Sequence, residues 1–288
     1  MKLISLFIVL ILVFTALETV NSYRRRTTSK TKNTMKLTAG SAMKATVQNG
    51  NAWHWKNRRG FVKDLSLNSY NDFVSIDGRN TLWGVDRMTN RWKRYPGGRT
   101  GVLAAAFGND NTVWICRGNI IEKFIPFHSD KFKGRWVTIP GCCRDIDIGA
   151  NGFVAVIGCD NHRWGFGIWR NLGGDGRRWA RVDGQADRIA VGGRGQMVVK
   201  NRGRSIFWKY SYSTAWVHTS GAALDVAVTS NGRMVVIGTD HHVYWSRTIG
   251  PRPQWVKNNG AGYAISTRTL NTKRNLMVVG MDHQLWRA

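Results

Sequence analysis

The sequence has little negative charge: among its 288 residues, 17 Asp and Glu stand against 43 Lys and Arg, a formal net charge of +26. This imbalance excludes a neutral or acidic surface, and it favours anionic partners such as acidic glycans, phosphorylated lipids, anionic membranes or nucleic acid. Seven positive and no acidic residues lie between Tyr23 and Gly50, which leaves a charge of +19 on residues 51–288. The main body of the chain is therefore basic in its own right.

Long hydrophobic runs are missing except at the start. An unbroken apolar run covers residues 3–14, and Val20-Asn21-Ser22 precede a cleavage point at Tyr23. This pattern predicts a secretory signal peptide over residues 1–22, and so a secreted, extracellular protein. An uncleaved anchor is the alternative, because three arginines follow at residues 24–26, but the run is short for a span of about 20 residues.

Large apolar residues are also scarce over residues 23–50, which are rich in Lys, Arg, Thr, Ser and Asn. Such a segment buries too little apolar surface to offset the entropy lost on ordering. We expect a flexible basic arm here, with a trimmed pro-segment as the alternative, and a folded domain over residues 51–288.

Helical periodicity is absent after Tyr23; what is present instead is a repeat. The pattern Trp-x4-Gly occurs six times, at Trp55/Gly60, Trp92/Gly97, Trp136/Gly141, Trp179/Gly184, Trp216/Gly221 and Trp255/Gly260. A period of about 40 residues indicates stacked supersecondary units. Within each unit apolar residues alternate with a period of two, as in the segments DIDIG, RIAVG and DVAVT, which is typical of strands.

The turns between these segments complete the unit. Asn151-Gly152 and Asn231-Gly232 predict tight hairpins, and Gly158-Cys159-Asp160, Gly238-Thr239-Asp240 and Gly280-Met281-Asp282 mark the next turn. Four antiparallel strands in each of six units predict an all-β fold, a six-bladed β-propeller. Small residues on the first of these strands suit the crowded centre: Gly149, Ala190, Gly192 and Ala227.

The two ends of the chain are expected to meet. The last unit ends at Trp286 without a following Trp-x4-Gly strand, whereas the first Trp-x4-Gly precedes the first complete unit. Residues 53–58 should therefore supply the outer strand of the last blade, which removes an exposed edge.

These residues carry a resemblance. The recurring Trp-x4-Gly, the Asp-Ile/Val-x-Ile/Val strand, Asn-Gly, and Val-Val-Ile-Gly-x-Asp followed by Trp-Arg are similar to tectonin-type β-propeller repeats, over residues 53–288. The family includes secreted invertebrate lectins and fish egg lectins, and the resemblance implies binding of glycans and lipopolysaccharide with no cofactor. Three units depart from the pattern: Glu122-Lys123 replace the closing Trp, and Arg188 and Ala264 replace the Asp. Six equivalent sites are therefore not expected.

Catalytic motifs are missing: the sequence has no His-Glu-x-x-His, nucleophile elbow, phosphate loop or Cys-x-x-Cys. We therefore expect no enzyme, although propeller active sites can be assembled from distant blades. Nothing resembles a nucleic-acid module, so no specific nucleic acid is expected.

Candidate binding residues recur near one turn of the repeat. They are the polar residues Asp160, His162, Asp240, His242, Asp282 and His283, together with the aromatic-basic pairs Trp169 and Arg170, Trp245 and Arg247, and Trp286 and Arg287. Asp and His can hydrogen-bond sugar hydroxyls or bind a metal, and a sugar ring can stack on Trp while Arg holds a phosphate or carboxylate. The alternative is structural: Asp caps its own turn, and Trp packs between blades.

The chain has only four cysteines, which in an exported protein suggest two disulfides with three possible connectivities. A hairpin that places Gly149 opposite Phe153 puts Cys143 opposite Cys159, which leaves Cys116 for Cys142; free thiols are the alternative. Taken together, the sequence predicts a secreted lectin with several shallow sites for glycans or lipopolysaccharide. A non-enzymatic adaptor propeller for a protein or an anionic membrane is the alternative.

Overall fold

The computed structural model describes residues 53–58, 60–86, 89–127, 130–211, 213, 215–268 and 275–288. The expected signal peptide over residues 1–22 and basic arm over residues 23–50 lie outside them. Within the described residues the chain forms strands and turns, and no helix is present. An all-β fold is therefore confirmed for this part of the chain.

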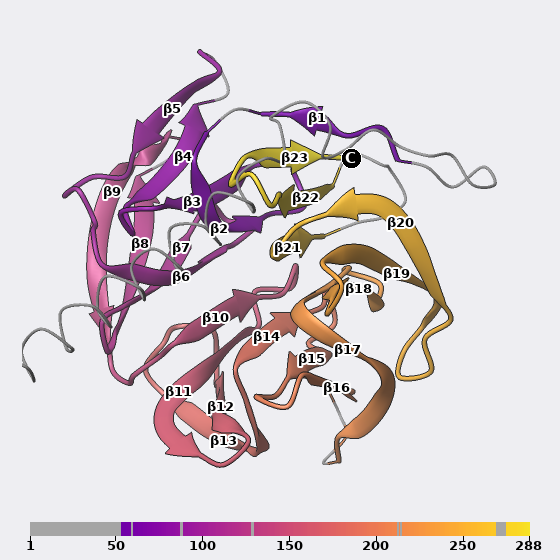
Figure 1. The fold of residues 1–288 in the computed structure, drawn as a ribbon. Coiled ribbons are helices and arrows are strands. Elements are labelled where there is room, and N and C mark those ends of the chain that lie inside the picture. Colours follow the sequence, from indigo (N-terminus) through magenta and orange to yellow (C-terminus); the bar gives the residue numbers. More distant parts are fainter. Residues whose placement is uncertain are drawn as a thin grey trace, which may run out of the picture. The chain divides into compact units, whose positions relative to one another are not determined.

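The strands form five antiparallel sheets (Figure 1). The first sheet contains β2 (Val62–Leu67), β3 (Phe73–Asp77), β4 (Leu82–Asp86) and β5 (Arg91–Arg94). The second sheet contains β6 (Val102–Phe107), β7 (Val113–Arg117), β8 (Ile120–Phe127) and β9 (Asp130–Ile139). The third sheet contains β10 (Asp145–Ile148), β11 (Val154–His162), β12 (Gly165–Asn171) and β13 (Trp179–Ala186).

The remaining strands form two further sheets. The seven-stranded sheet contains β14 (Arg188–Val191), β15 (Met197–Lys200), β16 (Ser205–Lys209), β17 (Val217–Val228), β18 (Arg233–Gly238), β19 (His242–Ile249) and β20 (Trp255–Ala261). The closing sheet contains β21 (Ala264–Thr267), β22 (Leu276–Val279), β23 (Leu285–Arg287) and β1 (Lys56–Asn57).

The long strand β17 belongs to two neighbouring sets of strands. Its first part pairs with β16, with His218 opposite Phe207, and its last part pairs with β18, with Val226 opposite Val236. The strand nearest the centre in each set contacts the next around a closed cycle, in the order β2, β6, β10, β14, β17, β21 and back to β2. The described residues therefore form a β-propeller of antiparallel blades.

The N-terminal strand closes this propeller. Lys56 lies opposite Arg287 and Asn57 opposite Trp286, so β1 pairs antiparallel with β23 at the outer edge of the closing sheet (Figure 1). The expectation that residues 53–58 pair with the last strand of the chain is confirmed. This pairing joins the two ends and covers the edge of β23.

The Trp-x4-Gly pattern has a structural explanation at the outer strands. The indole N–H of one repeat donates to the residue that precedes the glycine of the repeat before it: Trp136 to the Pro96 carbonyl at 2.8 Å, and Trp179 to the Pro140 carbonyl at 2.8 Å. Trp255 bonds the Ser220 carbonyl at 2.9 Å, Trp216 bonds the Asp183 carbonyl, and Trp55 bonds Asn259 Oδ1 at 3.2 Å. We call this series of contacts the indole relay.

The glycine is required because the next indole lies against it. A Cβ on Gly184 would lie 3.1 Å from Trp216, and one on Gly260 would lie 2.4 Å from Trp55. Gly184 also has a φ of 105°, a conformation that L side chains rarely adopt. Trp at one end and Gly at the other are therefore two halves of one contact between neighbouring repeats.

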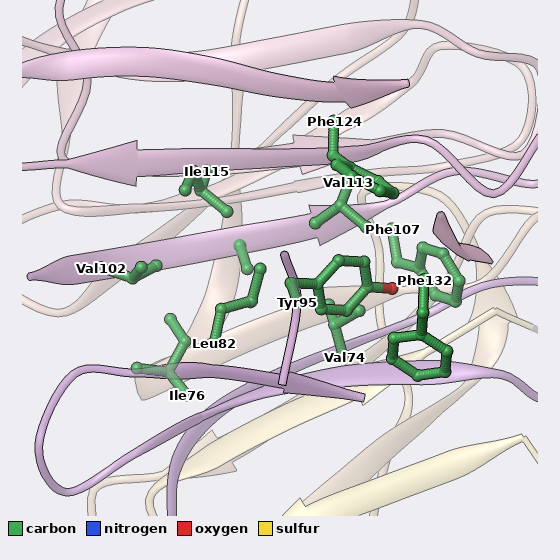
Figure 2. Packing of buried hydrophobic residues seen from close by; sticks show 11 residues of the cluster. Val74, Ile76, Leu82, Tyr95, Val102, Phe107, Val113, Ile115, Phe124 and Phe132 are labelled. Carbon is green, nitrogen blue, oxygen red and sulfur yellow. The ribbon is translucent and has the colours of Figure 1, made fainter. Parts of the chain in front are cut away.

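Apolar side chains from facing sheets fill the space between them. Figure 2 shows the cluster between the first and second sheets, where Tyr95 packs edge-on against Phe124 with ring centroids 5.3 Å apart. Val74, Ile76 and Leu82 come from the first sheet, and Ile115 and Phe124 come from the second. Alternation along each strand gives both of its faces such a cluster, as expected for a blade packed between two others.

Buried charge lies at the centre of the propeller. The Arg188 guanidinium is 3.4 Å from Asp145, 3.7 Å from Asp64 and 3.7 Å from Asp225. A second guanidinium, that of Arg268, bonds Asp147 at 2.8 Å and is almost fully buried. Position 188, where the repeat pattern has Asp, is thus occupied by an arginine that serves as the counter-ion of three aspartates from other repeats.

Burial has a large effect on these central carboxyls. Loss of hydration raises the pKa of Asp64, Asp145 and Asp225 to about 6, even though Arg188 opposes the shift. Asp145 also accepts the Ile189 backbone N–H at 2.7 Å, and Asp225 accepts that of Ile265 at 2.8 Å. Each of these two carboxylates thus connects its own inner strand to the next one around the cycle.

All four cysteines are paired, but the predicted pairing is wrong. The disulfides join Cys116 to Cys143 and Cys142 to Cys159, instead of Cys143 to Cys159 and Cys116 to Cys142. The hairpin register itself is as predicted, with Asp145 opposite Ile157. The error lies one residue further out.

A recurring β-bulge explains the shift. The strand pairs β2–β3, β6–β7 and β17–β18 all skip one residue, at Lys63, Leu103 and Leu224. Arg144 occupies the same position before β10, and its N–H bonds the Ile157 carbonyl. A skip here brings Cys142 opposite Cys159 and turns Cys143 into the apolar cluster that contains Cys116.

One predicted turn also differs. The chain turns at Gly238-Thr239-Asp240 and near Gly280-Met281-Asp282, but β11 continues through residues 158–160 to His162 and turns at Arg163-Trp164. This hairpin is longer than its counterparts, and a register shift between Ile157 and Asn161 accommodates the extra residues.

Candidate functional site

A carboxylate near the hairpin between the second and third strands meets an aromatic side chain in three parts of the propeller. Asp77 accepts the Trp83 indole N–H at 2.8 Å, Asp240 accepts the Tyr244 hydroxyl at 2.8 Å, and Asp282 accepts the Trp286 indole N–H at 3.2 Å. The same carboxylates accept backbone N–H groups, for example Asp240 from His242 at 3.1 Å. These carboxylates therefore cap their own turns, as predicted, and each of them also orients an aromatic ring.

Asp160 is surrounded by donors. It bonds Arg181 Nη1 at 2.8 Å and His162 Nε2 at 3.2 Å. Burial raises its pKa, but the bonds from His162, Arg181 and Trp169 lower it by more, so the pKa lies below its usual value. Trp169 and Arg181 are opposite each other in the β12–β13 pair, and the guanidinium lies over the indole at 5.6 Å. The cation beside Trp169 is thus Arg181; Arg170, being the next residue in the strand, points to the other face of the sheet.

The Asp240 site repeats this arrangement with other side chains. Lys257 Nζ lies 2.9 Å from Asp240, and Lys257 is opposite Tyr244 in the β19–β20 pair. Burial raises the pKa of Asp240, but the bonds from Lys257, Tyr244 and His242 lower it well below its usual value. His242 Nδ1 lies 3.3 Å from the same carboxylate. The carboxylate is ionised and already shared among several donors.

Trp245 and Arg247 lie apart from this carboxylate. Trp245 packs against the cluster between β18 and the closing sheet, 6.4 Å from the Trp53 ring, with Arg233 over its face at 5.2 Å. Arg247 is exposed, and its backbone N–H bonds the Gln254 carbonyl. Trp245 therefore belongs to the packing between sheets.

His283 and Arg287 of the closing sheet lie in different environments. The His283 ring stacks on Phe61, with centroids 4.7 Å apart, and its Nδ1 lies 2.5 Å from the Tyr263 hydroxyl. Arg287 lies opposite both Met277 and Lys56 in the strand ladder. His283 thus supports a side chain, Phe61, that lines the hollow described next.

A hollow of about 630 Å³ opens beside the first sheet. We call it the Trp83 hollow; its lining includes Phe61, Asp77, Arg79, Trp83, Trp92 and Arg94. Phe61 is 57% exposed, and the Arg94 guanidinium lies 4.9 Å from the Trp83 ring. Aromatic faces beside a carboxylate and two guanidinium groups suit a ligand that has both an apolar face and hydroxyl or acidic groups.

The carboxylate of this hollow is held in its ionised form. Burial raises the pKa of Asp77, but hydrogen bonds from the Thr81 N–H, the Trp83 indole and the Arg79 N–H lower it by more, so the pKa lies below its usual value. Asp77 remains an acceptor throughout the physiological pH range.

A second hollow, of about 480 Å³, lies between the third and seven-stranded sheets. We call it the Phe207 hollow; its lining includes Trp164, Gln185, Asn201, Ser205, Phe207 and Trp216. Phe207 pairs with Val199 and His218 as Trp83 pairs with Ser75 and Arg94, so the two hollows occupy equivalent positions. They differ in charge: Asp77 and Arg94 line the first, whereas Asn201 lines the second and His218, which corresponds to Arg94 in the strand pairing, is not part of its lining.

The equivalent positions of the second and third sheets are occupied differently. Glu122 takes the place of the aromatic residue in the second sheet and forms ion pairs with Arg117 at 2.6 Å and Arg99 at 3.3 Å. In the third sheet the disulfide between Cys142 and Cys159 takes the places of Phe61 and Gly78. Charge pairing in one sheet and a covalent bond in the other thus occupy these positions.

Sequence reasoning did not select the main residues of the Trp83 hollow: Phe61, Asp77, Trp83 and Arg94. The segment from Asp77 to Trp83 was readable as one more turn followed by a closing Trp. Arg94, two residues after Trp92, was also readable, because Arg181 and Lys257 stand two residues after Trp179 and Trp255. The signal for this site is the register between the third and fourth strands, which places Arg94 opposite Trp83.

The described residues lack a cluster of metal ligands and a membrane-spanning helix. They contain no group of three or more His, Cys, Asp or Glu side chains arranged to hold a metal ion. None of their segments is a helix long and apolar enough to cross a membrane.

Comparison with known proteins identifies the fold. No protein-family model and no curated protein matches the sequence. A structure of YCF48 bound to D1 peptide is similar with a TM-score of 0.50 and 16% identity, over 80% of each chain. The β-propeller domain of Cps50 (Swd1) from Myceliophteria thermophila has a TM-score of 0.54 and 10% identity, over 81% of this chain and 98% of that one. A candidate gluconolactonase has a TM-score of 0.57 and 12% identity, over 83% and 92%. The chain has a β-propeller fold; at these identities the likeness concerns the fold alone.

Proposed function

We propose that this chain is a secreted lectin of the tectonin type, a six-bladed propeller that binds glycans, including those of lipopolysaccharide, without catalysing a reaction. The count of six rests on the closed cycle of inner strands and on the indole relay, in which six Trp-x4-Gly repeats follow one another and Trp55 meets Gly260. On this proposal the seven-stranded sheet serves as two blades that share β17.

The Trp83 hollow is the observation that carries the proposal. Trp83 presents an indole whose N–H is held by Asp77, and exposed Phe61 forms another wall. A pyranose ring has an apolar face that stacks on indole and hydroxyls that bond carboxylate and guanidinium groups. Asp77 already accepts two backbone N–H groups, the Trp83 indole and the Thr81 hydroxyl, which fill its roughly four lone-pair sites. It therefore orients the indole and leaves Arg79 and Arg94 to bond the sugar.

The Phe207 hollow supports binding through more than one site. It keeps the aromatic walls but has Asn201 in place of Asp77. Two shallow sites on one rigid propeller raise the avidity for a repetitive surface by effective concentration, even when each site is weak. The net charge of the chain adds long-range attraction to phosphorylated glycans.

A binding role is also favoured by how the acidic residues are used. Asp64, Asp145 and Asp225 surround Arg188 at the centre, and Asp240 is engaged by its own turn and by Lys257. These carboxylates therefore form ion pairs that stabilise the fold, which is the use expected of acidic residues in a binding protein.

A glycan array followed by titration with the best monosaccharide tests the proposal. Changing Arg94 to Ala should weaken binding by at least about tenfold, because a charge-assisted hydrogen bond contributes roughly 1.5–3 kcal/mol. The matched control is Arg181→Ala, which removes the equivalent guanidinium from the third sheet, where a disulfide replaces the Phe61 wall. Binding that responds equally to the two changes would contradict the assignment to the Trp83 hollow.

The array also separates the lectin from an adaptor propeller that binds a protein or an anionic membrane. A lectin should be competed by one free monosaccharide at physiological salt, whereas an adaptor should show no sugar preference. Binding that disappears as salt rises and that no monosaccharide competes would favour the adaptor.

A further inference from the structure

A third hollow, of about 930 Å³, lies where the two ends of the described chain meet. Residues of β1, the end of β23 and loops of the first sheet line it, among them His54, Lys56, Arg58, Tyr70, Asn90 and Arg287. We call it the Tyr70 hollow. It shares Trp92 with the Trp83 hollow and otherwise has its own lining.

Positive charge is concentrated in this hollow. Lys56, Arg58 and Arg287 are permanent cations, and among the described residues that line it the one acidic side chain is Asp72, which lies 2.7 Å from Lys131. Lys56 and Arg58 are exposed, so they can turn toward a ligand. The local field thus favours an anion.

The strand ladder itself places two of these cations together. Lys56 and Arg287 are directly opposite each other in the β1–β23 pair. Residues directly opposite each other project from the same face of a sheet, and these two lie on the short pair that closes the propeller. An anion bound beside them would contact both strands of this pair.

The remaining lining suits something larger than a bare ion. Tyr70 is 61% exposed and Trp92 is half-buried, so both offer ring surface, and the exposed Asn90 of the lining offers an amide. The volume falls in the range of pockets that hold small organic ligands, roughly 300–1,000 Å³. Sugar rings stack on such aromatic faces, and guanidinium groups bond sulfate or phosphate oxygens in pairs.

We propose that the Tyr70 hollow binds a sulfated or phosphorylated saccharide, with the ester group held between Lys56, Arg58 and Arg287. This site is separate from the proposed lectin hollows, because its lining comes from the junction of the chain ends and is not repeated around the propeller. Binding there stabilises the closing pair of strands, since the ligand contacts both of them.

The test measures binding and melting temperature with a sulfated heparin hexasaccharide, the same hexasaccharide after desulfation, and a hexose phosphate. We expect the sulfated sugar or the hexose phosphate to bind and to raise the melting temperature, and the tighter of the two identifies the ester. The desulfated sugar should bind at least about tenfold more weakly than the sulfated one, since two to three ionic contacts are lost. Equal binding of the sulfated and desulfated sugars would overturn the proposal.

The variant K56Q/R58Q tests the location. Its affinity for the charged sugar should fall by about tenfold, whereas K133Q/R135Q should change it by less than about twofold. The control matches in charge and spacing, because Lys133 and Arg135 are exposed residues two apart on the outer strand β9. Equal losses in both variants would mean diffuse attraction to a polycation and would overturn the site.

A second variant covers the case in which K56Q/R58Q does not fold. Asn90→Asp places a negative charge in the lining of the hollow, and the φ of 52° at this position is one that Asp also accepts. It should weaken binding of the charged sugar, and unchanged affinity would again contradict the proposal. A neutral monosaccharide that competes at the lectin hollows should leave this binding intact, so failure of one proposal is distinguishable from failure of the other.

Discussion

The aspartates at the centre of the propeller and those at its hairpins have the same side chain, but their pKa values are shifted in opposite directions. Burial raises the pKa of Asp64, Asp145 and Asp225 to about 6, whereas Asp240 has its pKa lowered by Lys257, Tyr244 and the His242 N–H. Three central carboxylates share the Arg188 guanidinium, while Asp240 has several donors to itself. The number of hydrogen-bond donors available to each carboxylate, together with its access to water, thus decides whether its pKa is raised or lowered.

The largest effect should come from removing the central guanidinium. Arg188→Leu leaves three carboxylates without their counter-ion, which should lower the free energy of unfolding by about 3–5 kcal/mol at pH 7.5. The loss should be smaller at pH 4.5, because carboxyls with a raised pKa are then protonated. Denaturant unfolding at both pH values measures it, and an equal loss at the two pH values would contradict the account.

Removing the buried disulfide should come next. Cys116→Ala with Cys143→Ala should cost about 3 kcal/mol, because the bridge closes a loop with a sequence separation of 27. Cys143 is fully buried, whereas Cys142 and Cys159 are partly exposed, so mild reductant should open the second bridge first. Denaturant unfolding of the double variant measures the cost, and peptide mapping without full reduction shows which bridge opens first; a Cys143–Cys159 peptide would refute the pairing.

The outer strands should respond more weakly than the centre. Trp55→Ala removes the Asn259 bond and the contact with Gly260, and should cost about 2 kcal/mol, since this half-buried indole gains less from packing than a core residue. Deletion of residues 23–48 serves as the control, with an unchanged melting temperature expected. Equal melting of the two proteins would mean that β1 does not contribute to closure.

The pH profile sharpens the comparison. A raised pKa in the folded state means that stability increases as pH falls from about 7.5 to 4.5, and is lost again as pH rises through 6. In Asp225→Asn the gain in the free energy of unfolding between pH 7.5 and pH 4.5 should be smaller by about 1–2 kcal/mol, because one of the three titrating groups is gone.

Asp240→Asn should leave the same pH interval unchanged, which makes it the matched control. Because the pKa of Asp240 is lowered in the folded protein, its ionised carboxylate stabilises the fold at any pH above the ordinary Asp pKa. This stabilisation is lost only as the pH falls below that value, toward the lower folded-state pKa. The overall cost at pH 7 should be below about 1 kcal/mol, since the site is largely exposed. Unfolding curves of both variants from pH 3 to 8 test the contrast.

Much of the fold was readable from the sequence because it depends on local periodicity. Alternating apolar residues, Asn-Gly turns and the Trp-x4-Gly spacing repeat at intervals that a single sequence displays, and closure follows from the unpaired Trp55. The bulge at Arg144 was not readable, since a skipped residue leaves apolar alternation nearly intact. That one residue was enough to exchange the cysteine partners.

The site was less accessible for a related reason. Trp169 and Arg170 are neighbours in sequence but face opposite ways, whereas Trp83 and Arg94 meet because two strands pair. Arg188 is a similar case: the sequence marks it as a lost aspartate, and its meaning depends on three residues from other blades. Side-chain partners across strands depend on register, and register needs the bulges.

The indole relay also makes the propeller a structure without a natural first blade. Trp55 packs on Gly260 as Trp216 packs on Gly184, although its indole bonds the side chain of Asn259 and not a backbone carbonyl, so the junction of the chain ends resembles the connections between consecutive repeats. A circular permutant that joins Ala288 to Trp53 and begins in the exposed Gly173–Asp175 loop would keep every Trp–Gly contact. In such a protein the order of the repeats along the chain changes, while the order of the blades around the centre does not.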